Sequence, residues 1–122
     1  MEKEFIPYEQ ALALKELGFD EPCFGYHNID PYLKIPAFNL VKPFEHEWCL
    51  PAPLKQQVFR WFREKHGYYI SVFRTHDNNW GVDLWLLGVH KPKATIFGET
   101  YEEAENACLN KLIELTTNRL RN

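Results

Sequence analysis

The sequence predicts a single α+β domain spanning residues 1–122, built from a small antiparallel sheet and about three helices. Two observations support this class. Helical and strand patterns do not alternate regularly, which disfavours a parallel sheet with crossover helices. Two strand patterns are joined by a short polar turn, which is typical of an antiparallel hairpin. A chain of 122 residues has the length of one domain with one core.

The first helix is expected within residues 7–22, "PYEQALALKELGFDEP". Pro7 suits a first helical turn, where its missing N–H is not needed, and Gly18 is a natural helix stop. The following "CFGYH" is a strand candidate, bounded by Pro22 on one side and Pro31 on the other.

Six of the eight prolines lie between Pro22 and Pro53. Proline fixes φ and lacks an amide donor, so this region is expected to contain neither a long helix nor a central strand. We expect short edge strands around Tyr32–Ile35 and Glu47–Leu50, joined by an ordered loop that is rich in aromatic residues.

A second helix is expected over residues 52–67, "APLKQQVFRWFREKHG", with Pro53 in its first turn and Gly67 as its stop. Apolar residues at i, i+4, i+7 and i+8 predict one buried face. That face consists of Leu54, Val58, Trp61 and Phe62. Arg60 and Arg63 are expected to project from the other side.

Two strands, "YYISVFRT" and "WGVDLWLLG", flank "HDNN", which is a plausible hairpin turn. Strand alternation places one set of side chains on a core face: Ile70, Val72, Val82, Leu84 and Leu86. It places a second set on the opposite face: Tyr69, Ser71, Phe73, Asp83 and Trp85. A hairpin that is apolar on both faces needs a second covering layer, a partner chain or a ligand.

The third helix is expected after Pro92, in "ETYEEAENACLNKLIEL". Thr100 and Glu103 match the capping-box pattern T-x-x-E. Helical spacing predicts a buried face made of Tyr101, Ala104, Cys108, Leu112 and Leu115.

The N-terminal helix and "CFGYHN", the block "PAPLKQQVFRWFREKHGYYISV" and the third helix together resemble a family of small uncharacterised proteins of phages and prophages of gut Bacteroidetes. This resemblance implies a phage accessory protein that acts inside a bacterial host. It implies no activity and no catalytic residues.

Composition narrows the function classes. The formal net charge of −3 disfavours a general nucleic-acid binder, although five bases against Glu64 make residues 55–75 locally basic. Aromatic residues reach 16%, so rings are expected on the surface as well as in the core. No signal peptide or membrane span is expected. Three scattered cysteines predict a reduced, cytoplasmic protein.

One constellation has the chemistry of a metal site. Two thiolates and two imidazoles, from Cys23, His27, His46 and Cys49, would suit tetrahedral zinc, although their spacing is not that of a usual zinc finger. Free cysteines are also common core residues. We therefore expect no metal and no other cofactor.

A second constellation suits a ligand. Arg60, Arg63 and Arg74, together with Tyr69, Phe73 and Trp85, would hold a phosphate or stack on a base. These arginines would equally serve to solvate the surface.

The sequence contains no P-loop, no H-E-x-x-H and no G-x-S-x-G. The function expected is a non-catalytic binding module that binds a host protein or sequesters a small anionic ligand, for instance in evading host defence. The alternatives are a small metal- or cysteine-dependent enzyme and a single-stranded nucleic-acid binder. The surplus of rings also predicts a homodimer.

Overall fold

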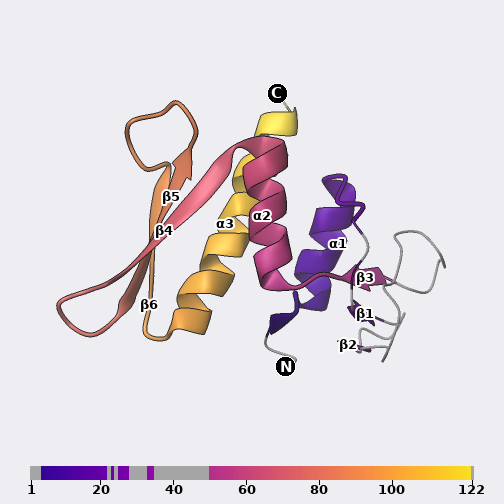
Figure 1. The fold of residues 1–122 in the computed structure, drawn as a ribbon, viewed down its shortest axis with the longest axis horizontal. Helices are drawn as coiled ribbons and strands as arrows, with labels where there is room; N and C mark the ends of the chain where they lie inside the picture. Colours follow the sequence, from indigo (N-terminus) through magenta and orange to yellow (C-terminus); the bar gives the residue numbers. More distant parts are fainter. Residues whose placement is uncertain (1–3, 22, 24, 28–32, 35–49, 122) are drawn as a thin grey trace. The chain divides into compact units, whose positions relative to one another are not determined.

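The computed structural model describes residues 4–21, 23, 25–27, 33–34 and 50–121. By its internal contacts the chain divides into two compact units, residues 1–60 and 61–122, and each is described by itself. Helices and antiparallel strands occur in both, which confirms the α+β class with its antiparallel sheet and three helices (Figure 1). A single domain over residues 1–122 stays a prediction.

Helix α1 spans Tyr8–Glu16 and ends in a Schellman motif. Gly18 adopts φ +94°. Its N–H donates to the Lys15 carbonyl at 3.1 Å, and the Phe19 N–H donates to the Leu14 carbonyl at 3.0 Å. Gly18 is therefore the helix stop that the sequence predicts, because glycine adopts positive φ without steric cost.

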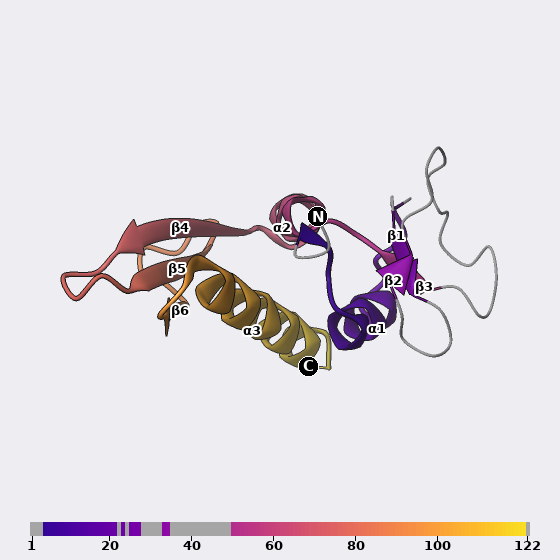
Figure 2. The same cartoon turned by 90° about the horizontal axis from the view of Figure 1, so that it is seen from below.

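The first unit contains a three-stranded antiparallel sheet of order β2-β1-β3. Its strands are β1 (Gly25–His27), β2 (Leu33–Lys34) and β3 (Leu50–Ala52). Pro51 lies in the edge strand β3, where a missing amide donor is tolerated. Most of the strand expected at Glu47–Leu50 lies outside the described residues. Figure 2 shows α1 beside β3.

The core of the first unit joins its N-terminal segment to the segment that precedes α2. The Ile6 N–H donates to the Pro53 carbonyl at 2.9 Å, and Phe5 forms a β-bridge with Leu54. Pro53 therefore lies before the helix, and α2 (Lys55–His66) begins later than the sequence predicts. The buried apolar residues of this unit include Phe5, Ile6, Ala11, Leu14, Phe19, Ala52 and Val58.

Helix α2 continues into the second unit and ends at Gly67, as predicted. Gly67 has φ +76°, and its N–H donates to the Arg63 carbonyl at 3.2 Å. Val58, Trp61 and Phe62 are at most 3% exposed, which confirms three of the four residues on the predicted face. The fourth, Leu54, precedes the helix and is half-buried.

The second unit contains a three-stranded antiparallel sheet of order β4-β5-β6. The predicted hairpin is confirmed as β4 (Tyr68–Arg74) and β5 (Trp80–Leu86), paired in the register Ser71↔Asp83. Strand β6 (Ala94–Gly98) pairs with β5 and is absent from the sequence prediction. Its signal is short: a β-branched and aromatic run, "ATIFG", that follows Pro92 closely.

The turn between β4 and β5 uses the predicted polar residues. Asn78 has φ +65°, a conformation that asparagine tolerates better than most residues. Its N–H donates to the Thr75 carbonyl at 3.2 Å, and the Thr75 N–H donates to the Asn79 carbonyl at 2.9 Å.

Helix α3 (Tyr101–Arg121) begins with a variant of the predicted cap. The Glu103 N–H donates to the Thr100 hydroxyl at 3.1 Å, whereas the Glu103 carboxylate accepts from the Glu99 N–H at 3.0 Å. The helix continues six residues beyond the predicted end at Leu115. Its buried residues include Ala104, Cys108, Leu109 and Leu112.

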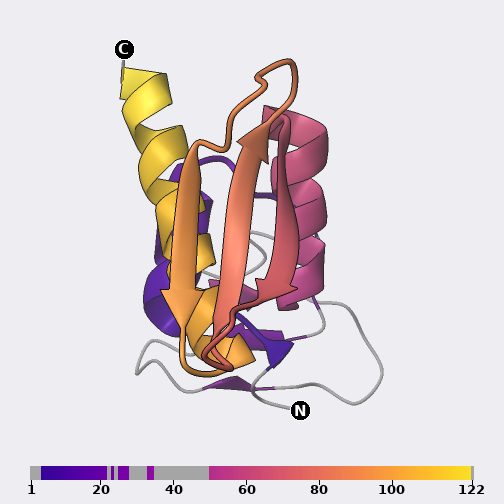
Figure 3. The same cartoon turned by 90° about the vertical axis from the view of Figure 1, so that its left-hand side faces the viewer.

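Helix α3 packs on one face of the β4–β6 sheet, against β5 and β6. Figure 3 shows the three strands side by side, with α3 behind them. Val82 and Leu84 are 2% and 0% exposed on this covered face. The prediction that Val72 is core is wrong, because Val72 lies on the edge strand β4 and is 39% exposed. Ile70, in the same strand, is only half-buried.

Candidate functional site

The other face of the β4–β6 sheet is the candidate site. The strand register aligns its side chains in three rows that run across the strands. The rows are Tyr69 with Trp85, then Ser71 with Asp83 and Thr95, then Phe73 with Gly81 and Phe97. We call these eight residues the open face, since α3 lies on the opposite side of the sheet (Figure 3).

The two outer rows of the open face are aromatic. The rings of Tyr69 and Trp85 are stacked, with centroids 6.2 Å apart and planes 9° from parallel. Phe73 and Phe97 meet edge to face, with centroids also 6.2 Å apart. Phe97 is 61% exposed and Tyr69 is 38% exposed. Exposed rings in this number are typical of an interaction surface.

The Phe73 ring extends over its neighbour strand at Gly81, where there is no side chain in its way. A Cβ at Gly81 would lie only 2.3 Å from the Phe73 Cζ atom. The absence of a side chain at Gly81 thus leaves room for this ring on the sheet.

The middle row of the open face is polar. The Thr95 hydroxyl donates to the Asp83 carboxylate at 2.7 Å. Asp83 is half-buried, and among the described residues it forms no ion pair with Lys or Arg. None of the open-face residues is basic. The surface therefore has a carboxylate between two aromatic rows.

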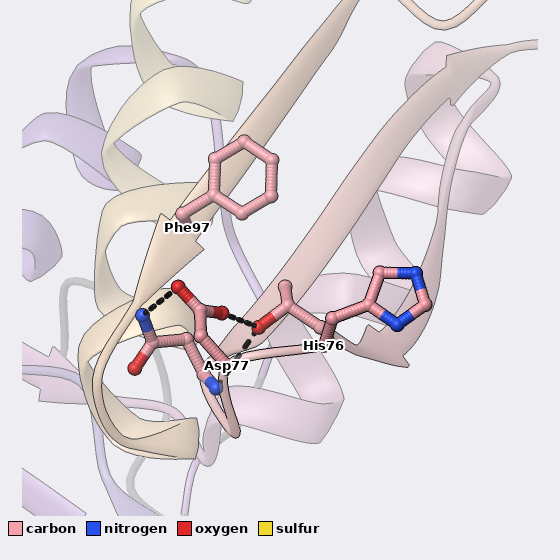
Figure 4. A pocket seen from close by; sticks show the side chains of 5 residues that line it. His76, Asp77 and Phe97 are labelled. Carbon is pink, nitrogen blue, oxygen red and sulfur yellow. Dashed lines mark hydrogen bonds between the residues drawn. The ribbon is translucent and has the colours of Figure 1, made fainter.

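An open depression of ≈ 530 Å³ adjoins the open face at the β4–β5 turn. It is lined by Thr75, His76, Asp77, Asn79 and Phe97. The Asp77 carboxylate accepts hydrogen bonds from the Thr75 hydroxyl and the Asn79 side-chain amide, and Figure 4 shows the His76 ring pointing away from it. The Thr75 hydroxyl donates to Asp77, which lowers the pKa of that carboxyl, and backbone N–H groups lower it further. This end of the face therefore carries a second fixed negative charge.

The arginines that the sequence groups with these rings are not on the open face. Arg74 lies in the row opposite Trp80, with its guanidinium 4.5 Å from the centre of that ring. Arg63 is exposed on α2. Arg60 belongs to the first unit, where it lies 3.7 Å from the Glu21 carboxylate. The structure thus brings together Tyr69, Phe73 and Trp85 of the predicted ligand site, without its cations.

The sequence prediction missed Thr95 and Phe97, because it assigned no strand to residues 94–98. Alternation in "ATIFG" was the available signal, since Ala94 and Ile96 point to one face and Thr95 and Phe97 to the other.

The described half of the proposed zinc site has the following geometry. Cys23 is fully buried, and its Sγ donates to the Glu21 carbonyl at 3.2 Å. Burial, and then the Glu21 charge, raise the pKa of the Cys23 thiol to about 12. The His27 Nε2 donates to the Ile6 carbonyl at 2.9 Å, which leaves Nδ1 buried without a hydrogen-bond partner in the described part of the chain.

His46 and Cys49 lie outside the described residues, so the described structure does not test the zinc candidate. Zinc would have to displace the proton of Cys23, and His27 Nδ1 is the ligand atom that remains on its ring. Within the described ranges, no three His, Cys, Asp or Glu side chains gather as a metal site would require.

The described cysteines are poor candidates for a nucleophile. Cys108 is buried in α3, and burial, followed by the charge of Glu105, raises the pKa of its thiol to about 12. At neutral pH Cys108 and Cys23 are therefore thiols, whereas the thiolate is the reactive form.

None of the described helices combines the length and the hydropathy that a bilayer crossing requires. No protein-family model, no curated protein and no solved structure matches this chain.

Proposed function

We propose that this chain is a non-catalytic binding module that engages a partner protein through the open face. One observation carries the proposal: α3 covers only one face of the β4–β6 sheet, and the other face carries four aromatic rings. Rings of this kind supply most of the binding energy at protein interfaces, because they remove a large apolar area from water at a small entropic cost.

A protein partner fits this surface better than a small anionic ligand. The open face is extended: its two aromatic rows are about 13 Å apart, because Phe73 is four residues from Tyr69 along β4. Its fixed charge is negative, and the candidate arginines lie elsewhere. A phosphate would therefore meet a carboxylate where it needs a cation. On the resemblance to phage proteins, the partner would be a protein of the bacterial host.

Affinity capture tests this proposal. Immobilised wild type and the variant Phe97→Ser are incubated with lysate of a gut Bacteroidetes bacterium, and bound proteins are quantified by mass spectrometry. Leu120→Ser is the matched control, because Leu120 is 58% exposed and Phe97 is 61% exposed, but Leu120 lies on α3.

We expect at least one host protein that wild type and Leu120→Ser retain and that Phe97→Ser loses. Capture that is the same for all three proteins, or the absence of any captured protein, would contradict a function based on the open face.

A further inference from the structure

The polar row of the open face specifies the chemistry of its partner. Aspartate is disfavoured within strands, yet Asp83 occupies the middle position of the central strand of this sheet. Its carboxylate accepts a hydrogen bond from Thr95 and has no cation beside it among the described residues. In the free protein, water solvates the remaining lone pairs.

A partner that covers the open face removes this water. Covering an ionised carboxylate without a compensating charge is strongly unfavourable, so the partner must bring a cation or several donors to Asp83. A second copy docking with the same face brings another Asp83 and no basic open-face residue. The nearby Lys93, which precedes β6 and is exposed, does not neutralise Asp83, because the two form no ion pair in the described structure.

The rings on either side of Asp83 favour one cation over the other. Trp85 is two residues, or about 7 Å, from Asp83 along β5. Gly81 is equally far in the other direction, and the Phe73 ring lies over it. A guanidinium is planar, stacks on aromatic faces and donates two parallel hydrogen bonds to a carboxylate. The ammonium group of lysine is not planar, and it cannot donate two parallel hydrogen bonds to a carboxylate.

We infer that the open face binds an arginine-bearing segment of a partner protein, whose guanidinium pairs with Asp83 between the two aromatic rows. This inference rests on the proposed function and adds the chemistry of the partner. The sequence suggests an anionic ligand, whereas the inferred ligand group is a cation.

The first step of the test uses a displayed library of random twelve-residue peptides, selected on wild-type protein. Only peptides that lose binding to Phe97→Ser are kept, so that every retained binder uses the open face. We expect arginine to be enriched in these peptides relative to the unselected library. Retained peptides without this enrichment would overturn the inference.

The second step measures the affinity of synthetic versions of three retained peptides by calorimetry. Asp83→Asn keeps the size and the acceptor for Thr95 but removes the charge. We expect it to weaken binding at least about tenfold, because a charge-assisted contact is lost. Glu102→Gln, in the first turn of α3, makes the same change in net charge elsewhere and is expected to alter affinity less than twofold.

A double-mutant cycle identifies the contact itself. Replacing the peptide arginine with citrulline keeps its shape and removes its charge. This change should weaken binding to wild type at least about tenfold, and weaken binding to Asp83→Asn far less. Equal losses on both proteins would place the arginine elsewhere and overturn the pairing with Asp83.

The outcomes separate the two proposals. If no peptide depends on Phe97, the proposed function fails, and this inference fails with it. If peptides depend on Phe97 but not on Asp83, only this inference fails. A single-stranded oligonucleotide that binds Asp83→Asn more tightly than wild type, and that competes with the peptides, would overturn it in favour of nucleic acid.

Discussion

The two faces of the β4–β6 sheet are made by the same strands, and yet they have opposite physical roles. On the covered face, Val82 and Leu84 are buried against α3. On the open face, Phe97 and Tyr69 are 61% and 38% exposed. The difference shows that ring content alone does not locate a core, because the layer that lies on a face decides whether its rings stabilise the fold or remain available.

The same contrast appears in two glycines of this sheet. A Cβ at Gly98, on the covered face, would lie 2.6 Å from the Ala104 backbone nitrogen. For a Cβ at Gly81, on the open face, the three nearest atoms are all at the far end of the Phe73 ring. The backbone of α3 is fixed in place, whereas the ring can swing toward solvent.

Truncating the covered face should have the largest effect. Leu84→Ala removes a fully buried side chain and is expected to lower the free energy of unfolding by about 2–5 kcal/mol. Val72→Ala, at the exposed edge of the same face, is the control and should cost about 1 kcal/mol or less. Urea denaturation of both variants measures the difference. Similar losses would show that α3 does not determine which positions are core.

The two glycines should respond unequally to alanine. Gly98→Ala is expected to lower the free energy of unfolding by about 1–3 kcal/mol, because the helix backbone must move. Gly81→Ala should change it by less than about 1 kcal/mol, since the Phe73 ring can yield. Thermal unfolding compares the two. A larger cost at Gly81 would indicate that the open face is packed in the folded protein.

Truncating the open face should affect binding and leave stability nearly unchanged. Phe97→Ser is expected to change the free energy of unfolding by less than about 1 kcal/mol, because most of the ring is already in water. Chemical denaturation beside the capture experiment checks this. A Phe97→Ser protein that unfolds would mean that loss of capture reports loss of folding rather than of a contact.

The smallest expected effect is a dependence of stability on pH that arises from His66, at the end of α2. Arg119 of α3 donates a hydrogen bond from Nη2 to the His66 Nδ1 at 2.8 Å. Burial, and then the charge of Arg119, lower the pKa of His66 below its ordinary value of 6.5. The folded protein thus binds this proton more weakly than the unfolded chain does. Neutral His66 therefore contributes to the free energy of unfolding above pH 6.5, its pKa in the unfolded chain. This contribution is lost as the pH falls from 6.5 toward the lower pKa of the folded protein.

We therefore expect the melting temperature to drop slightly between pH 7.5 and pH 5.5, and to drop less in His66→Gln, which does not titrate. An identical drop in both proteins would assign the effect to groups other than His66.

The sequence by itself determined the local elements that are marked by a regular spacing of apolar residues, or by a glycine or polar turn at their ends. Gly18 and Gly67 stop their helices at positive φ, as glycine placement predicts. Helical spacing identified Val58, Trp61 and Phe62 as buried, and strand alternation with a polar turn identified the hairpin. These features depend on backbone sterics and on side-chain period, which are properties of a short stretch of chain.

Only the tertiary structure decided which of those elements are covered. The short strand β6 is defined by its pairing with β5, and this pairing adds Thr95 and Phe97 to the candidate site. Alternation could not tell that Val72 would be exposed at an edge, or that Arg74 would lie over Trp80. Period assigns a side chain to a face, but burial depends on which distant segment packs on that face, and α3 packs on only one.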